Sequence, residues 1–233
     1  MTKFLCVLIY LLLILTNYQL MTINIFANFQ DNPNIKHTNK IVKKEIQIKK
    51  EVVEIHPSLP NYIFEASLFE YFSLDSSSKI SNYIVVKISR VDASISSEIQ
   101  LIEVELGSLN HLEDVTNYYS LEDFNFDGYT DLSIMDPNSS AYNLSYTWYE
   151  FEQKTGKLNG SSQLCEELNN LINPIVHKEL QLIEEIDKAT SQGEWTVSFY
   201  KVRNGKLALI KRLETSLDSY YDDIDKEFYK LRH

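Results

Sequence analysis

The chain has 233 residues, which is enough for one good-sized domain or two small ones. Hydrophobic residues make up 44% of it and aromatic residues 12%, an ordinary globular composition that excludes an intrinsically disordered chain. The net charge of −11 argues against a nucleic-acid backbone as partner and suits a cation or a basic protein better. A soluble domain without either partner could carry the same charge.

Residues 1–27 are predicted to be a signal peptide outside the fold. Lys3 precedes an apolar run over residues 4–16 that is shorter than the about 20 apolar residues of a transmembrane span. Ala27 is the candidate residue before the cleavage site. An uncleaved membrane anchor over residues 4–26 is the alternative. We therefore expect an exported protein, periplasmic or extracellular, which stays membrane-anchored if the leader is retained.

The expected export makes the number of cysteines informative, because exported proteins can form disulfides. Residues 28–40 are polar and are predicted to be a tether, and once the leader is removed Cys165 is the only cysteine left. The mature domain then has no internal disulfide, so its stability must come from a core or from a bound metal. Leu164, Leu168 and Leu171 have helical spacing around Cys165, which indicates a buried structural thiol.

Most of the segment 41–216 predicts strands, and we expect one mainly β domain there, a β-sandwich or twisted antiparallel sheets with one short helix. Residues 41–55 alternate as a half-buried strand, with Ile46 and Ile48 on one face. The Asn204-Gly205 pair is a strong hairpin signal. The other predicted strands are 82–91 and 98–106, joined as a hairpin, then 131–135, ending at Asp136-Pro137, then 141–153, 194–202 and 206–213. A helix is predicted over 162–173, and the acidic tail 217–233 has the pattern of a short helix.

Within the stretch LEDFNFDGYTDLS at 121–133, the nine residues 123–131 gather three carboxylates and an amide, and the like charges repel one another. A bound cation relieves that repulsion, and Ca²⁺ takes six to eight oxygens at about 2.3–2.6 Å. Ligands at alternate positions of a tight loop point inward, and Gly128 permits the sharp turn. The predicted calcium ligands are the side chains of Asp123, Asn125, Asp127 and Asp131 and the backbone carbonyl of Tyr129.

The loop differs from an EF-hand. An EF-hand carries a bidentate Glu at the twelfth position, which here is Ile134, and the flanks do not have the pattern of two helices. We therefore predict a calcium loop that leads into a strand, with Phe124 and Phe126 anchoring it to the core. The alternative is an Asp- and Asn-rich turn that binds no metal.

The loop and the segments after it resemble a known family. The blocks DFNFDGYTDL, YTWYEFEQKTGKL, LNNLINP and YKVRNGKLALI are similar to a family of exported bacterial calcium-binding proteins, over roughly residues 100–213. Those proteins are similar in fold to periplasmic lysozyme inhibitors, and some are immunity proteins against peptidoglycan hydrolases. The loop itself is also FG-GAP-like. The resemblance implies a β-rich fold with one calcium loop, whose ligands fall on the same five residues.

The family resemblance also implies a partner. Inhibitors of this kind insert a loop of small and hydroxyl residues into the cleft of a lysozyme-like muramidase, and the segment 136–142 has that character. Ser139, Ser140 and Tyr142 are the candidate contacts, because uncharged hydroxyls can approach catalytic carboxylates without repulsion. A solvated turn after Pro137 is the alternative for these three residues.

An enzymatic function finds little support in the sequence. The five histidines are scattered, and no metal-ligand spacing such as HExxH occurs. We therefore expect a non-catalytic protein that binds calcium and inhibits a peptidoglycan hydrolase, and the resemblance implies the role of an immunity protein. The second hypothesis is a surface binding or adhesion module that holds calcium only for stability.

Overall fold

The structure is a computed structural model that describes residues 41–73, 78–91, 96–107, 114–140, 143–188, 193–216 and 218–232. These residues belong to one compact unit, Lys40–His233. The predicted leader 1–27 and tether 28–40 lie outside them. Among the residues described, no helix is both long and apolar enough to cross a membrane.

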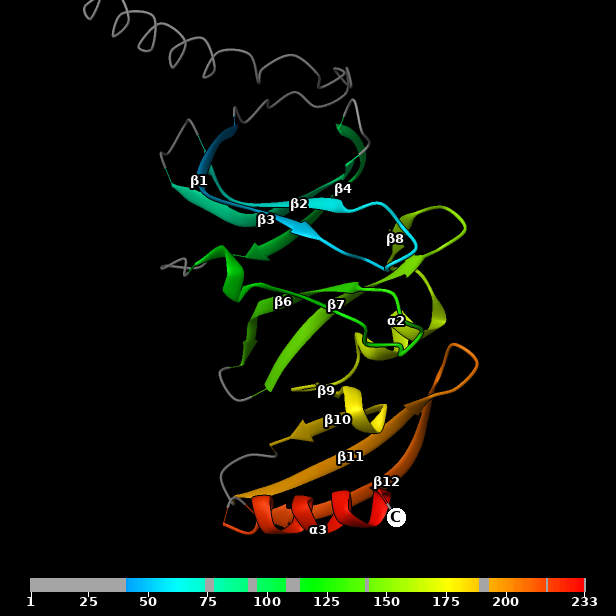
Figure 1. The fold of residues 1–233 in the computed structure, drawn as a ribbon. Coiled ribbons are helices and arrows are strands. Elements are labelled where there is room, and N and C mark those ends of the chain that lie inside the picture. Colours follow the sequence, from blue (N-terminus) through cyan, green and yellow to red (C-terminus); the bar gives the residue numbers. More distant parts are fainter. Residues whose placement is uncertain are drawn as a thin grey trace, which may run out of the picture. The chain divides into compact units, whose positions relative to one another are not determined.

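The protein is mainly β, as predicted, with three four-stranded antiparallel sheets (Figure 1). The first sheet has the order β1-β2-β3-β4, with β1 Ile41–Val53, β2 Tyr62–Ser73, β3 Lys79–Val91 and β4 Ser96–Gly107. The middle sheet has the order β5-β6-β7-β8, with β5 Tyr119–Glu122, β6 Asp131–Ser140, β7 Asn143–Glu152 and β8 Lys157–Asn159. The third sheet has the order β12-β11-β10-β9, with β9 Ile175–His177, β10 Leu182–Asp187, β11 Glu194–Val202 and β12 Leu207–Ser216.

The first sheet packs one face on the main core, and its inner strands β2 and β3 also bury some residues of the other face. Phe64, Ala66 and Leu68 of β2 alternate into a core that also contains Leu132 and Ile134 of β6. The expected burial of the β1 isoleucines is wrong: Ile46 and Ile48 are 36% and 59% exposed. The reason is that β1 is an edge strand whose register shifts between Glu45 and Gln47. This β-bulge changes which side chains face the core.

The middle sheet differs from the prediction at Pro137. β6 continues to Ser140 instead of ending at Asp136, and its pairing with β7 is irregular between Asp136 and Ser140. Proline lacks the N–H that a regular ladder needs, so a strand can pass through it where the ladder is interrupted.

The helix α2 (Gln163–Leu168) is half as long as the predicted segment 162–173. It begins as expected, because Ser162 is the N-cap and its side chain accepts a hydrogen bond from the Cys165 N–H. It ends at Asn169. Cys165 is buried, as predicted, and burial raises the pKa of its thiol to about 11.

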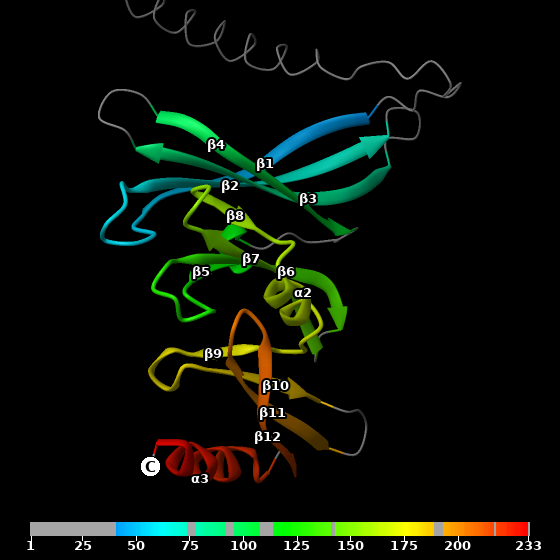
Figure 2. The same ribbon diagram turned by 90° about the vertical axis from the view of Figure 1, so that its right-hand side faces the viewer.

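The third sheet carries the C-terminal helix. The β11–β12 hairpin turns through Asn204 (φ 53°) and Gly205 (φ 70°), both left-handed as a two-residue hairpin turn requires. Figure 2 shows α3 (Tyr220–Arg232, red) beside this hairpin. Ile224 of α3 is buried with Val197 and Phe199 of β11, so the acidic C-terminal segment contributes to a core.

The three sheets are joined through side chains. Gln100 of β4 both donates to and accepts from the backbone of Leu158 in β8, at 2.7 and 2.8 Å. A second buried cluster links the middle and third sheets; it contains Phe124, Trp148, Leu164, Cys165, Leu168, Leu171 and Ile183. Residues 123–130, which connect β5 to β6, therefore lie against this cluster through Phe124.

Candidate metal centre

The loop between β5 and β6 is organised by its own polar side chains. The Asp123 carboxylate accepts the N–H of Asp127 (3.1 Å) with one oxygen and that of Gly128 (2.9 Å) with the other. Asn125 Oδ1 also accepts the Asp127 N–H (3.0 Å), and Asp127 Oδ1 accepts the Tyr129 N–H (2.9 Å). These bonds wind the backbone of the loop around the side chains of Asp123, Asn125 and Asp127.

Two residues of the loop have left-handed backbone. Gly128 has φ 91°, which a side chain rarely adopts, so the predicted need for glycine at this turn is confirmed. Phe126 has φ 63°, a conformation that costs a non-glycine residue about 1 kcal/mol. Both Phe124 and Phe126 contact the second cluster, and Phe124 meets the Trp148 ring edge-on at 4.9 Å. The predicted anchoring of the loop by these two rings is therefore confirmed.

Asp131 closes the loop from inside the protein. Its side chain is fully buried, and its two oxygens accept the N–H of Phe151 (2.7 Å) and of Phe124 (3.2 Å). Burial raises its pKa to about 8, and the neighbouring carboxylates of Asp127 and Asp123 act in the same direction. Within the described part of the chain, no lysine, arginine or histidine forms an ion pair with Asp131.

The oxygen donors of the 123–131 loop can be compared with what a cation requires. In the described ranges, no three His, Cys, Asp or Glu side chains lie together as a ready-made metal cluster. The loop carboxylates instead accept backbone N–H groups, which leaves lone pairs on each oxygen, because a carboxylate has about four acceptor sites. Asp123, Asp127 and Asp131 are hard oxygen donors of the kind that Ca²⁺ binds, and so are the Asn125 amide and the Tyr129 carbonyl. The residue types of the loop therefore fit Ca²⁺, and in this structure their oxygens are held by N–H groups of the protein.

The side chain of Tyr129 points out of the loop, into contacts that the sequence did not reveal. Its ring stacks on His56 at 4.5 Å on one side and on Phe151 at 5.6 Å on the other. His56 lies in the turn between β1 and β2, far away in the sequence, and no motif marks it.

The predicted partner contacts are placed only in part. Ser139 lies in the irregular part of β6, where its hydroxyl donates to the Asp136 carbonyl, and Ser140 pairs with Asn143 of β7. Tyr142 lies outside the described residues. The predicted 136–142 loop is shorter than expected, since β6 includes residues up to Ser140.

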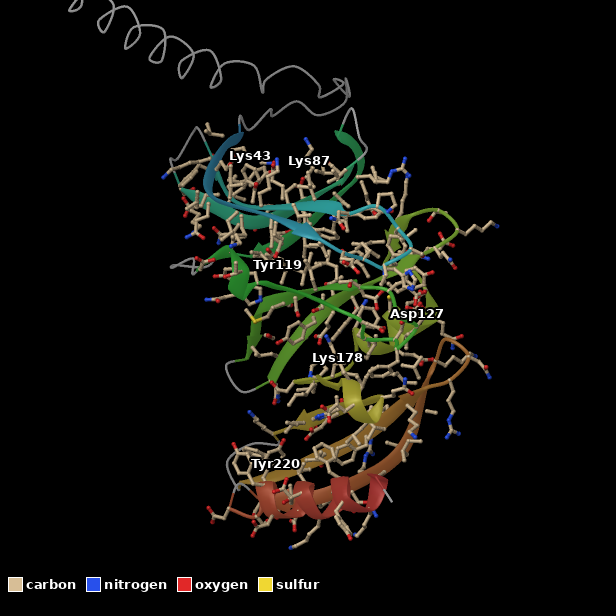
Figure 3. All side chains as sticks on the ribbon, in the orientation of Figure 1. Lys43, Lys87, Tyr119, Asp127, Lys178 and Tyr220 are labelled. Carbon is tan, nitrogen blue, oxygen red and sulfur yellow. The ribbon has the colours of Figure 1, made fainter. Side chains whose placement is uncertain are left out.

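The sequence also did not predict a polar cluster in the third sheet. Glu184 of β10 is buried; one oxygen lies 2.6 Å from His177 Nε2 and the other accepts the Tyr220 hydroxyl at 2.8 Å. Tyr220, labelled in Figure 3, lies at the start of α3. Beside this cluster is an open cavity of about 330 Å³, lined in part by His177, Lys178 and Phe228. Contacts between β9, β10 and α3 make the cluster, and no local pattern predicts them.

Comparison of the chain with protein-family models, with curated proteins and with solved structures finds no match.

Proposed function

We propose that the 123–131 loop binds one Ca²⁺ ion. The ligands are the side chains of Asp123, Asn125, Asp127 and Asp131 and the backbone carbonyl of Tyr129. The observation that carries the proposal is the environment of Asp131, a fully buried carboxylate influenced by two further carboxylates of the same loop. A divalent cation offsets both the burial of that charge and the repulsion among the three acids.

Calcium bound at this loop stabilises the domain. A ligand that binds only the folded state adds RT ln(1 + [L]/Kd), or about 2.7 kcal/mol at a hundredfold excess over Kd. The loop is well placed for this effect, because Asp131 bonds to β7 through Phe151 and the loop packs on the second cluster through Phe124. An exported chain without disulfides would gain from such a source of stability.

Thermal unfolding of the full chain in millimolar CaCl₂ and in chelator tests the calcium proposal. The melting temperature rises with calcium in the native chain, and Asp127→Ala abolishes the rise. Asp222→Ala, which removes an exposed acid of α3, is the matched control and keeps it. Identical melting curves of the native chain in calcium and in chelator would sink the proposal.

We further propose that the protein is exported and inhibits a peptidoglycan hydrolase without catalysing a reaction itself. The resemblance of residues 100–213 to calcium-binding immunity proteins supports this, and a net charge of −11 would steer the chain toward a basic muramidase. Ser139, Ser140 and Tyr142 are the proposed contacts.

The inhibitor proposal is tested by lysis of a peptidoglycan suspension by a panel of muramidases, with and without equimolar protein. We expect one hydrolase to be blocked, and Tyr142→Ala to weaken the block while the melting temperature stays the same. Protection against none of the panel would favour the adhesion-module alternative, in which calcium serves stability alone.

A further inference from the structure

The turn 54–61 between β1 and β2 is held by its own contacts and by the calcium loop. Within the turn, His56 Nδ1 lies 2.7 Å from the Ser58 hydroxyl, and the Leu59 N–H donates to the His56 carbonyl at 2.9 Å. The Ser58 N–H also donates to His56 Nδ1 at 3.1 Å, and the two contacts with Ser58 set the orientation of the His56 ring. Ile55, just before it, is buried in the core of the first sheet.

Three kinds of contact join this turn to the loop. The Thr130 N–H donates to the Ile55 carbonyl at 2.9 Å, and the Thr130 hydroxyl donates to the Glu54 carbonyl at 3.3 Å. The His56 ring stacks on Tyr129 with an interplanar angle of 24°. At Gly128, an added Cβ would lie 3.9 Å from His56 Cδ2, so the backbone of the loop also passes close to this ring.

The stack continues into the middle sheet. Tyr129 lies nearly parallel to Phe151 of β7 (14°), and the backbone N–H of Phe151 donates to Asp131. The His56–Tyr129–Phe151 stack therefore begins in the first sheet and ends on the residue that holds the buried acid of the loop. Tyr129 contributes its ring to the stack and its carbonyl to the proposed calcium site.

We infer that this ring stack couples calcium binding to the β1–β2 turn, so that the ion fixes the turn of the first sheet against the middle sheet. The inference rests on the proposed calcium site. An ion that fixes the backbone of Tyr129 and Thr130 also fixes the ring and the two hydrogen bonds that hold the turn. Because linkage is reciprocal, the stack must in turn increase the affinity of the loop for calcium.

Calorimetric titration of the full chain with CaCl₂ measures this coupling. Aromatic pairs contribute about 0.5–1.5 kcal/mol, so His56→Ala weakens calcium binding by about threefold to tenfold. His56→Phe keeps a ring in the stack and restores most of the affinity. Tyr71→Ala is the matched control, because it removes a ring of the first sheet that packs at a tilt against Tyr83 and not against the loop. The control binds calcium as the native chain does.

Hydrogen exchange of the full chain gives a second readout. The amides of residues 54–61 exchange more slowly in CaCl₂ than in chelator, and His56→Ala reduces that difference. Native calcium affinity in His56→Ala, together with unchanged exchange of the turn, overturns the coupling while leaving the calcium site intact. Absence of any calcium binding by the native chain overturns the site, and the coupling with it.

Discussion

Asp131 and Glu184 are both carboxylates removed from solvent, but the groups around them differ. Glu184 has a donor on each oxygen from a side chain of another element, His177 of β9 and Tyr220 of α3. Asp131 accepts two backbone N–H groups and has two further acids nearby. Both carboxylates therefore have a hydrogen-bond partner on each oxygen, and Asp131 in addition is influenced by two carboxylates of its own charge.

If the proposed calcium site is correct, the contrast separates a structural acid from an acid that binds an ion. Burial, and then the hydrogen bond to Glu184, raise the pKa of the Tyr220 phenol above its usual range, so this hydroxyl remains a donor. At Asp131, burial chiefly and then the carboxylates of Asp127 and Asp123 raise the pKa, and the two backbone hydrogen bonds oppose them. A buried acid that is paired within the fold should therefore be insensitive to calcium, and one surrounded by acids should depend on it.

The largest effect is expected for Asp131→Ala. In chelator it leaves the N–H groups of Phe124 and Phe151 without their acceptor, which lowers the free energy of unfolding by about 2 kcal/mol. In calcium at a hundredfold excess over Kd, the loss grows to about 5 kcal/mol, because the linkage contribution of about 2.7 kcal/mol disappears too. Denaturant unfolding in both buffers measures the difference. An equal loss in the two buffers would place Asp131 in the same category as Glu184.

Glu184→Ala is expected to lower the free energy of unfolding by about 3 kcal/mol, because His177 and Tyr220 both lose their partner. Unlike the stability loss of Asp131→Ala, the loss of Glu184→Ala is the same in calcium and in chelator. Glu179→Ala removes an exposed glutamate of the same region and is the control. A calcium-dependent loss in Glu184→Ala would contradict the separation of the two acids.

Gly128→Ala tests the backbone of the calcium loop. The left-handed φ of 91° strains any residue with a Cβ, and the space around the position is ordinary, so we expect a loss of about 1–2 kcal/mol from strain alone. Calcium affinity falls as well, since the same turn positions Asp127 and Tyr129. Denaturant unfolding of this variant measures its stability, and calcium titration measures its affinity. If both equal those of the native chain, the turn relaxes without strain.

The smallest effect is expected for Tyr220→Phe. It removes only the hydroxyl that donates to Glu184 and keeps the ring against Trp195. The free energy of unfolding falls by about 1 kcal/mol, with no calcium dependence. A loss as large as that of Glu184→Ala would mean that Tyr220, more than His177, supports the buried carboxylate.

Local signals predicted much of this fold from the sequence. The β11–β12 hairpin follows from Asn204-Gly205, the start of α2 from Ser162, and the left-handed turn of the loop from Gly128. β2 was not predicted. It is an inner strand between β1 and β3, and its hydrophobic residues lie on both faces, so the two-residue period is obscured.

The remaining differences depend on contacts distant in sequence. The path of β6 beyond Pro137 depends on its pairing with β7, and the exposure of Ile48 depends on a bulge against β2. At the candidate site, the proposed ligands could be chosen from the sequence because they alternate within nine residues of the chain. His56 could not, because only the folded first sheet brings its ring to Tyr129.

The buried thiol of Cys165 has a practical consequence. Its Sγ lies 3.4 Å from the Asn159 carbonyl, and the side chain belongs to the same cluster as Phe124 of the 123–131 loop. A thiol-alkylating reagent can react there only during transient opening of that cluster, so the labelling rate of Cys165 under native conditions reports how often it opens. Peptide mass distinguishes this label from one on Cys6. The labelling rate of Cys165 therefore measures local unfolding next to the 123–131 loop.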